Sequence, residues 1–194
     1  MTTLERAAEA LAGNGFTVEI LDSAAEARVR VEELIPAQAC VFTAASETLR
    51  LSGIDDDINR SGRYRAVKPR AATMDRAAEG DDLRRLVATP DVVVGSVNAL
   101  TETGSLVVAS ATGGQLPAYT GGAGRAIWLV GAQKVVPDLD AAVRRVQEHV
   151  LPLEDARVRR THGQPSAVNQ LLVLNAPPRL GHVTVLLLRE TIGY

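Results

Sequence analysis

The chain has 194 residues, 46% of them hydrophobic, which predicts one domain, residues 1–194, with a sizeable core. Its net charge of -2 and 3% aromatic content argue against nucleic-acid binding, and its single cysteine excludes an internal disulfide and a cysteine-based metal or iron–sulfur site. No apolar run is long enough for a membrane span and no signal-peptide pattern is present, so we expect a cytoplasmic protein without membrane attachment.

The first part of the chain alternates between helix and strand. A capping-box pattern predicts a helix over 2–12, and FTVEIL (16–21) alternates as a strand. A second helix, capped by Ser23, is predicted up to Pro36, before the apolar strand ACVFT (39–43). Strand, helix and strand in this order are the crossover unit of a parallel sheet.

The middle of the chain continues with two predicted helices, over 46–51 and 73–88. Between them, residues 60–70 hold five cations and no acid, a pattern that fits either a site for phosphate or carboxylate or a solvated loop. DVVVGS (91–96) then reads as a β-branched run typical of strands buried in parallel sheets.

The second half supplies further short apolar runs. SLVVAS (105–110) and AIWLVG (126–131) are bounded by glycine, and a helix capped by Asp138 is predicted as far as Val150. PSAVNQLLVL (165–174) is interpreted as a short helix, and HVTVLLLRE (182–190) as a last strand. This pattern predicts an α/β fold, a Rossmann-like parallel or mixed sheet with helices on both faces.

The segment from Gly95 to Gly131 holds eight of the 16 glycines and only two charged side chains, Glu102 and Arg125. Glycine lets backbone N–H groups approach a ligand, and loops at the carboxyl ends of parallel strands are where α/β proteins bind ligands. The segment therefore predicts a site for a small anion, although glycines that serve only packing are the alternative. The candidate ligand-binding residues are Asn98, Thr101, Thr103, Gly104, Gly113, Gly114, Gly121, Gly122, Gly124 and Arg125.

Glu102 is the candidate catalytic residue. A carboxylate between Thr101 and Thr103, just before a buried strand, must be hydrogen-bonded, paired with a cation or desolvated. A desolvated carboxylate acts as a general base or a nucleophile. A structural ion pair with Arg125 is the alternative.

The remaining titratable residues predict little chemistry. The three histidines are too scattered to predict a metal site, and only His162 lies in a loop where it could act as an acid or base. Lys134 follows an apolar strand and could reach an anion, but we expect it to be exposed. No dinucleotide-binding or phosphate-loop motif is present, so no cofactor is predicted.

Three stretches between Asp91 and Asn175 carry a resemblance to a known family: DVVVGSVNALTETGSLVVAS, GGQLPAYTGGAGRAIWLVGAQKVVPDLDAAVRRVQEHVLPLEDAR and SAVNQLLVLN. They resemble the LUD domain family of lactate-utilization proteins, most strongly over residues 91–194. The chain looks like the short, stand-alone branch of the family. Where the better known lactate-utilization members carry an acidic motif, this chain has SAVNQ (166–170).

The resemblance implies the fold shared by glucosamine-phosphate isomerase, ribose-phosphate isomerase and the coenzyme A transferases. It implies a protein of lactate or organic-acid metabolism that binds a small carboxylate, phosphate or coenzyme A-type ligand around Glu102, with iron–sulfur proteins of lactate oxidation as partners. The alternative is a transferase-like or isomerase-like enzyme with Glu102 as nucleophile or base, because Glu102-Thr103-Gly104 is similar in outline to the glutamate and glycine of coenzyme A transferases. A purely structural domain is the third possibility.

Overall fold

The centre of the computed structural model, which describes all 194 residues, is a sheet of six strands in the order β1-β10-β7-β4-β2-β3. Every neighbouring pair of strands runs parallel. The predicted α/β fold with a parallel sheet is confirmed. The strands are β1 (Thr17–Leu21), β2 (Cys40–Thr43), β3 (Arg65–Ala66), β4 (Val92–Ser96), β7 (Arg125–Gly131) and β10 (His182–Leu188).

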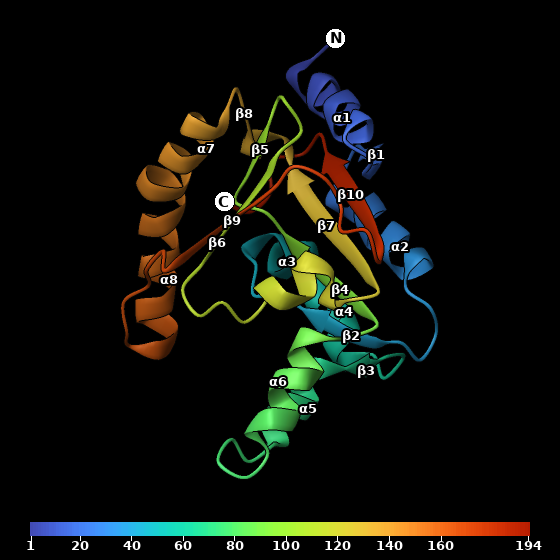
Figure 1. The fold of residues 1–194 in the computed structure, drawn as a ribbon, viewed down its shortest axis with the longest axis vertical. Helices are drawn as coiled ribbons and strands as arrows, with labels where there is room; N and C mark the ends of the chain where they lie inside the picture. The colour runs from blue at the N-terminus through green and yellow to red at the C-terminus, as the bar shows by residue number, and fades with distance from the viewer.

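Helices cover one face of this sheet and extend beyond its edge (Figure 1). The helices α2 (Ala24–Leu34), α3 (Glu47–Ser52) and α4 (Ile54–Arg60) place their apolar side chains in one cluster with residues of the central strands. The helices α5 (Val67–Thr73) and α6 (Gly80–Ala88) project past β3, and α6 has no buried side chain.

A second, smaller sheet and one helix cover the other face. The sheet has the order β8-β5-β6-β9, and its members are β8 (Val135–Val136), β5 (Ala99–Thr101), β6 (Leu106–Ser110) and β9 (Gln170–Leu174). β6 is antiparallel to both of its neighbours. The helix is α1 (Thr3–Gly13), whose predicted capping box at Thr2 and Glu5 is confirmed.

A continuous helix packs on the outer side of the second sheet (Figure 1). It comprises α7 (Leu139–Arg145), the wide turn η3 (Val146–Val150) and α8 (Leu151–His162). Ala142 and Val146 on this helix contact side chains of β5 and β6. None of the helices in the structure is both long and apolar enough to span a lipid bilayer.

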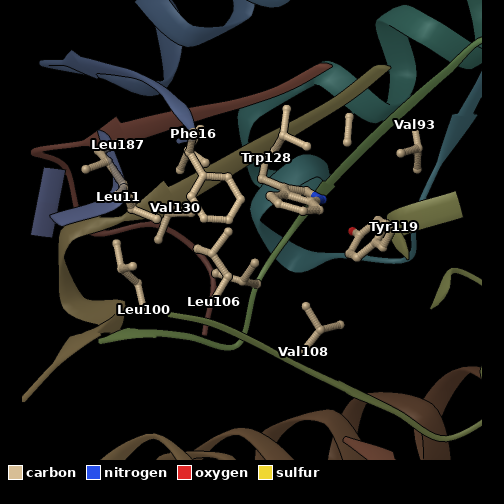
Figure 2. Packing of buried hydrophobic residues seen from close by; sticks show 14 of the residues in the cluster. Leu11, Phe16, Val93, Leu100, Leu106, Val108, Tyr119, Trp128, Val130 and Leu187 are labelled. Atoms are coloured by element: carbon tan, nitrogen blue, oxygen red, sulfur yellow. The ribbon is translucent and has the colours of Figure 1, made fainter. Parts of the chain in front are cut away.

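The core between the two sheets is built around Trp128, which is fully buried on β7. Its ring lies 5.2 Å from that of Tyr119 and 6.5 Å from that of Phe16, centroid to centroid (Figure 2). Tyr119 belongs to η1 (Ala118–Gly122), a wide turn that leads into β7. Three of the six aromatic residues of the chain are therefore buried in this core.

Three predicted elements differ from the structure. The segment 165–174 is not a helix, because residues 170–174 pair with β6 as strand β9; a short apolar run does not by itself distinguish the two. The predicted helix over 73–88 begins only at Gly80, as α6, because Thr73 ends the separate helix α5 and the Asp75 carboxylate then closes a turn by accepting hydrogen bonds from the Ala77 and Ala78 N–H groups.

The third difference is that the helix beginning after Asp138 does not end near Pro152 but continues to His162. Proline lacks the N–H that an α-helix needs at that position. The backbone widens into the turn η3 immediately before Pro152, and such a wide turn accommodates an interrupted hydrogen-bond ladder.

Candidate functional site

A cavity of about 420 Å³ opens at the carboxyl ends of the central strands. Residues 44–47 line it directly after β2, residues 96–98 at the end of β4, and Lys134 shortly after β7. The connection from β2 leads to β3 on one side, whereas that from β4 leads to β7 on the other. Ligands in open α/β sheets bind at such a reversal of strand order.

The remaining walls come from the second sheet, the long helix and the end of the chain. Residues 108–110 of β6 form one wall, and residues 164–168 close one side. The helix side is lined by Val146, Val150, Leu151, Glu154, Arg157, Val158 and His162, and Tyr194 completes the lining.

Lys134 is the most unusual residue of this lining. Its side chain is buried, with 2% of its surface exposed, which contradicts the expectation of an exposed lysine. Nζ donates to Thr48 Oγ1 at 2.9 Å, Ser96 Oγ at 3.0 Å and the Val97 carbonyl at 3.1 Å. All three partners are uncharged. Burial lowers the pKa of Lys134 to about 7, because the desolvated ammonium has no opposite charge beside it.

A second cation lies close to Lys134. The Arg145 charge lowers the pKa of Lys134 further, after the larger effect of burial. Arg145 Nη1 is itself buried without a hydrogen-bond partner, and burial lowers the pKa of the guanidinium. Arg145 does not line the cavity, but the next residue, Val146, does. Two basic side chains thus meet at this end of the cavity, and neither of them forms an ion pair with an acidic side chain.

The two acidic side chains of the lining are both paired with arginine, and the first, Glu47, accepts hydrogen bonds from Arg50. Glu154 accepts two hydrogen bonds from Arg157, at 2.8 and 2.7 Å, and one from the Tyr194 hydroxyl. Burial acts to raise the pKa of Glu154, but the hydrogen bonds from Arg157 and Tyr194 outweigh it and the pKa is lowered. Burial, followed by Glu154, raises the pKa of Tyr194. Glu154 thus has its own cation and does not compensate Lys134.

Glu102 lies outside the cavity, in the turn between β5 and β6. Its carboxylate accepts a hydrogen bond from Arg6 Nε on α1 at 2.8 Å, and 27% of its side chain is exposed. The alternative partner, Arg125, is exposed at the amino end of β7, whereas the cavity is at the carboxyl ends of the strands. The cavity therefore lies at Lys134 and not around Glu102. Glu102 forms its ion pair with Arg6 and not with Arg125.

The predicted ligand-binding residues are not brought together. Asn98 lines the cavity, and its Oδ1 accepts from the Ala109 N–H at 2.7 Å. The hydroxyls of Thr101 and Thr103 hydrogen-bond each other at 2.8 Å in the turn that holds Glu102. No glycine lines the cavity, neither Gly104 nor the loop glycines Gly113, Gly114, Gly121, Gly122 and Gly124.

Gly104 is required by packing. Its φ is +82°, and a Cβ at this position would lie 2.7 Å from the Ala10 backbone on α1. At this position glycine therefore serves packing, which was the alternative to ligand binding, since only glycine fits there without strain.

Sequence reasoning did not single out Arg145, Glu154 and Tyr194, and it weighed an anion contact for Lys134 but favoured an exposed lysine. One signal was available: 19 of the 21 basic residues are arginine, and the two lysines are Lys68 and Lys134. His162, the predicted acid–base candidate, does line the cavity, at the end of α8.

A family model described as the LUD domain matches residues 4–169. The chain belongs to the LUD domain family. A search of curated proteins finds no match for this LUD-domain chain. Among solved structures, it is similar to a DUF162 family protein from Deinococcus radiodurans, with a TM-score of 0.58 and 14% identity over 96% of each chain. At that identity the similarity concerns the fold.

Proposed function

We propose that this LUD-domain chain takes part in lactate or organic-acid metabolism by binding a small 2-hydroxy or 2-oxo carboxylate in the cavity beside Lys134. The family is named for lactate utilization, which favours acids of this class. Partnership with iron–sulfur proteins of lactate oxidation stays a prediction from the family resemblance.

The observation that carries the proposal is a buried amine without a counter-charge. A buried ammonium is strongly disfavoured unless an opposite charge is close. The nearest polar atoms to Lys134 are neutral, the second cation Arg145 repels it, and the carboxylate of Glu154 is held by Arg157. A ligand carboxylate in the cavity would supply the missing charge, and the cavity of about 420 Å³ has room for it.

The test is thermal unfolding with sodium L-lactate, sodium pyruvate or L-lactamide, a neutral analogue of the same size. The two carboxylates are expected to raise the melting temperature, since a ligand at a hundredfold excess over its Kd adds about 2.7 kcal/mol to the free energy of unfolding. L-Lactamide is expected to have no effect. Equal shifts with the amide and the acids would contradict the proposal.

Two matched variants locate the effect. Lys134→Met is expected to abolish the stabilisation by lactate. Lys68→Met removes the other lysine, which is paired with Asp55, and is expected to leave the stabilisation by lactate unchanged. Affinity in the unmodified protein is expected to be highest below about pH 7, where Lys134 is protonated, and to fall as pH rises. Binding that is unchanged in Lys134→Met would place the ligand elsewhere.

A further inference from the structure

The hydrogen bonds of Lys134 fit an uncharged amine as well as an ammonium. The Ser96 hydroxyl donates to the Leu129 carbonyl at 2.6 Å, so it accepts from Lys134, as the Val97 carbonyl does. The Thr48 hydroxyl donates to the Ile192 carbonyl over the longer distance of 3.5 Å, whereas Lys134 Nζ lies 2.9 Å from Thr48 Oγ1. By turning from Ile192 to Nζ, Thr48 can donate to the lone pair of a neutral amine, whose two N–H groups the other partners accept.

Only a lysine could serve in this way. Nearly all of the basic residues in the chain are arginine, and arginine keeps its proton under all conditions in proteins. The single buried lysine stands at the cavity, beside a second cation that disfavours its charge. Desolvation and a neighbouring cation are the two means by which proteins make a lysine amine nucleophilic.

We propose that Lys134 forms an imine with a 2-oxo acid in the cavity. This proposal rests on the proposed function, since the acid must first bind there. The Nζ lone pair attacks the ketone carbon, and the carbonyl π electrons move to oxygen, which takes up a proton. The resulting carbinolamine loses its oxygen as water while the C=N bond forms, so the two protons of the amine leave with the carbonyl oxygen. No oxidant or reductant is consumed, and hydrolysis reverses the step.

The experiment is reductive trapping of the full chain with pyruvate and sodium cyanoborohydride, followed by intact mass measurement and peptide mapping. We expect a single adduct on Lys134, equal in mass to pyruvic acid less one oxygen atom. The two-lysine composition makes the mapping direct, and Lys68→Arg, in which Lys134 is the only lysine, is expected to give the same adduct. Lys134→Arg is expected to lose the adduct completely.

The experiment separates imine formation from carboxylate binding. L-Lactate has no carbonyl at its second carbon, so it should bind without forming an adduct. Pyruvate that binds by calorimetry but gives no adduct, or labels only Lys68 or the N-terminal amine, would overturn the imine and leave carboxylate binding intact. Absence of pyruvate binding would overturn the imine, and absence of both pyruvate and L-lactate binding would overturn both proposals.

Discussion

Gly95 has no side chain, and this leaves room for the buried ring of Tyr119 in the core. A Cβ at Gly95 would lie 1.7 Å from the Tyr119 hydroxyl oxygen, and Tyr119 is buried with that hydroxyl donating to the Ser96 carbonyl at 3.2 Å. We expect Gly95→Ala to destabilise the protein by about 3 kcal/mol, because overpacking forces Tyr119 out of its position. Urea unfolding measures the change.

The matched control for this substitution is Gly80→Ala. Nothing lies within 4 Å of a Cβ at Gly80, which is the first residue of α6. We expect it to leave stability unchanged or raise it by less than about 1 kcal/mol, the helix preference of alanine over glycine. Equal changes in the free energy of unfolding at both positions would show that Tyr119 does not pack closely against Gly95.

Lys134 gives stability an unusual pH dependence. Its pKa is about 7 in the folded protein against an ordinary 10.5, so between these values the unfolded chain binds a proton that the folded chain does not. Stability should therefore rise with pH in this window, by about 1.4 kcal/mol per pH unit relative to Lys134→Met. Chemical unfolding of both proteins between pH 6 and about pH 10 measures the slope. If the free energies of unfolding of the two proteins changed with pH in parallel, Lys134 would have an ordinary pKa in the folded protein.

At the site, the sequence pointed to the carboxyl ends of the strands but not to the side chains that line the cavity there. Of the proposed residues, Asn98 lines the cavity, because the end of β4 does point there. Glu102 is isolated in sequence, yet its cation, Arg6, is 96 residues away and becomes a neighbour only when α1 packs on the second sheet. The burial of Lys134 likewise depends on α3, through Thr48, and on β4, which no local pattern could reveal.

At the level of elements, the ion pair between Arg6 and Glu102 joins α1 to the β5–β6 turn. Hydrogen bonding to Glu102 raises the pKa of Arg6, but both side chains are partly exposed, so the pair contributes little. We expect Glu102→Gln to change the melting temperature only slightly and carboxylate affinity by less than about twofold, since Glu102 shares no partner with Lys134. Calorimetric titration with lactate tests this, and a complete loss of binding would restore Glu102 to the site.

The elements themselves were largely predictable, because caps and hydrophobic periodicity are local. The side-chain caps predicted at Thr2, Ser23 and Asp138 are all present, and the apolar runs of the central sheet became its strands. What sequence reasoning could not supply was the partner of each strand. β9 is a strand because β6 lies beside it, and without that neighbour its apolar run fits a helix equally well.

At the scale of the whole molecule, burial predicts an uneven distribution of local stability. β7 and β10 lie in the middle of the sheet with nearly every residue buried, whereas α6 projects from the body without a buried side chain (Figure 1). Amides of α6 are expected to exchange with solvent far faster than those of β7 and β10, because α6 opens without disturbing the core. Hydrogen exchange followed by mass spectrometry measures this, and similar protection in all three would contradict it.

The position of β10 also bears on how the protein is made. β10 hydrogen-bonds β1 on one side and β7 on the other, although the ribosome produces it after both. Until those residues leave the exit tunnel, β1 has no partner in the sheet and the flank of β7 stays open. A nascent chain in this state presents unpaired apolar edges of the kind that molecular chaperones shield from aggregation.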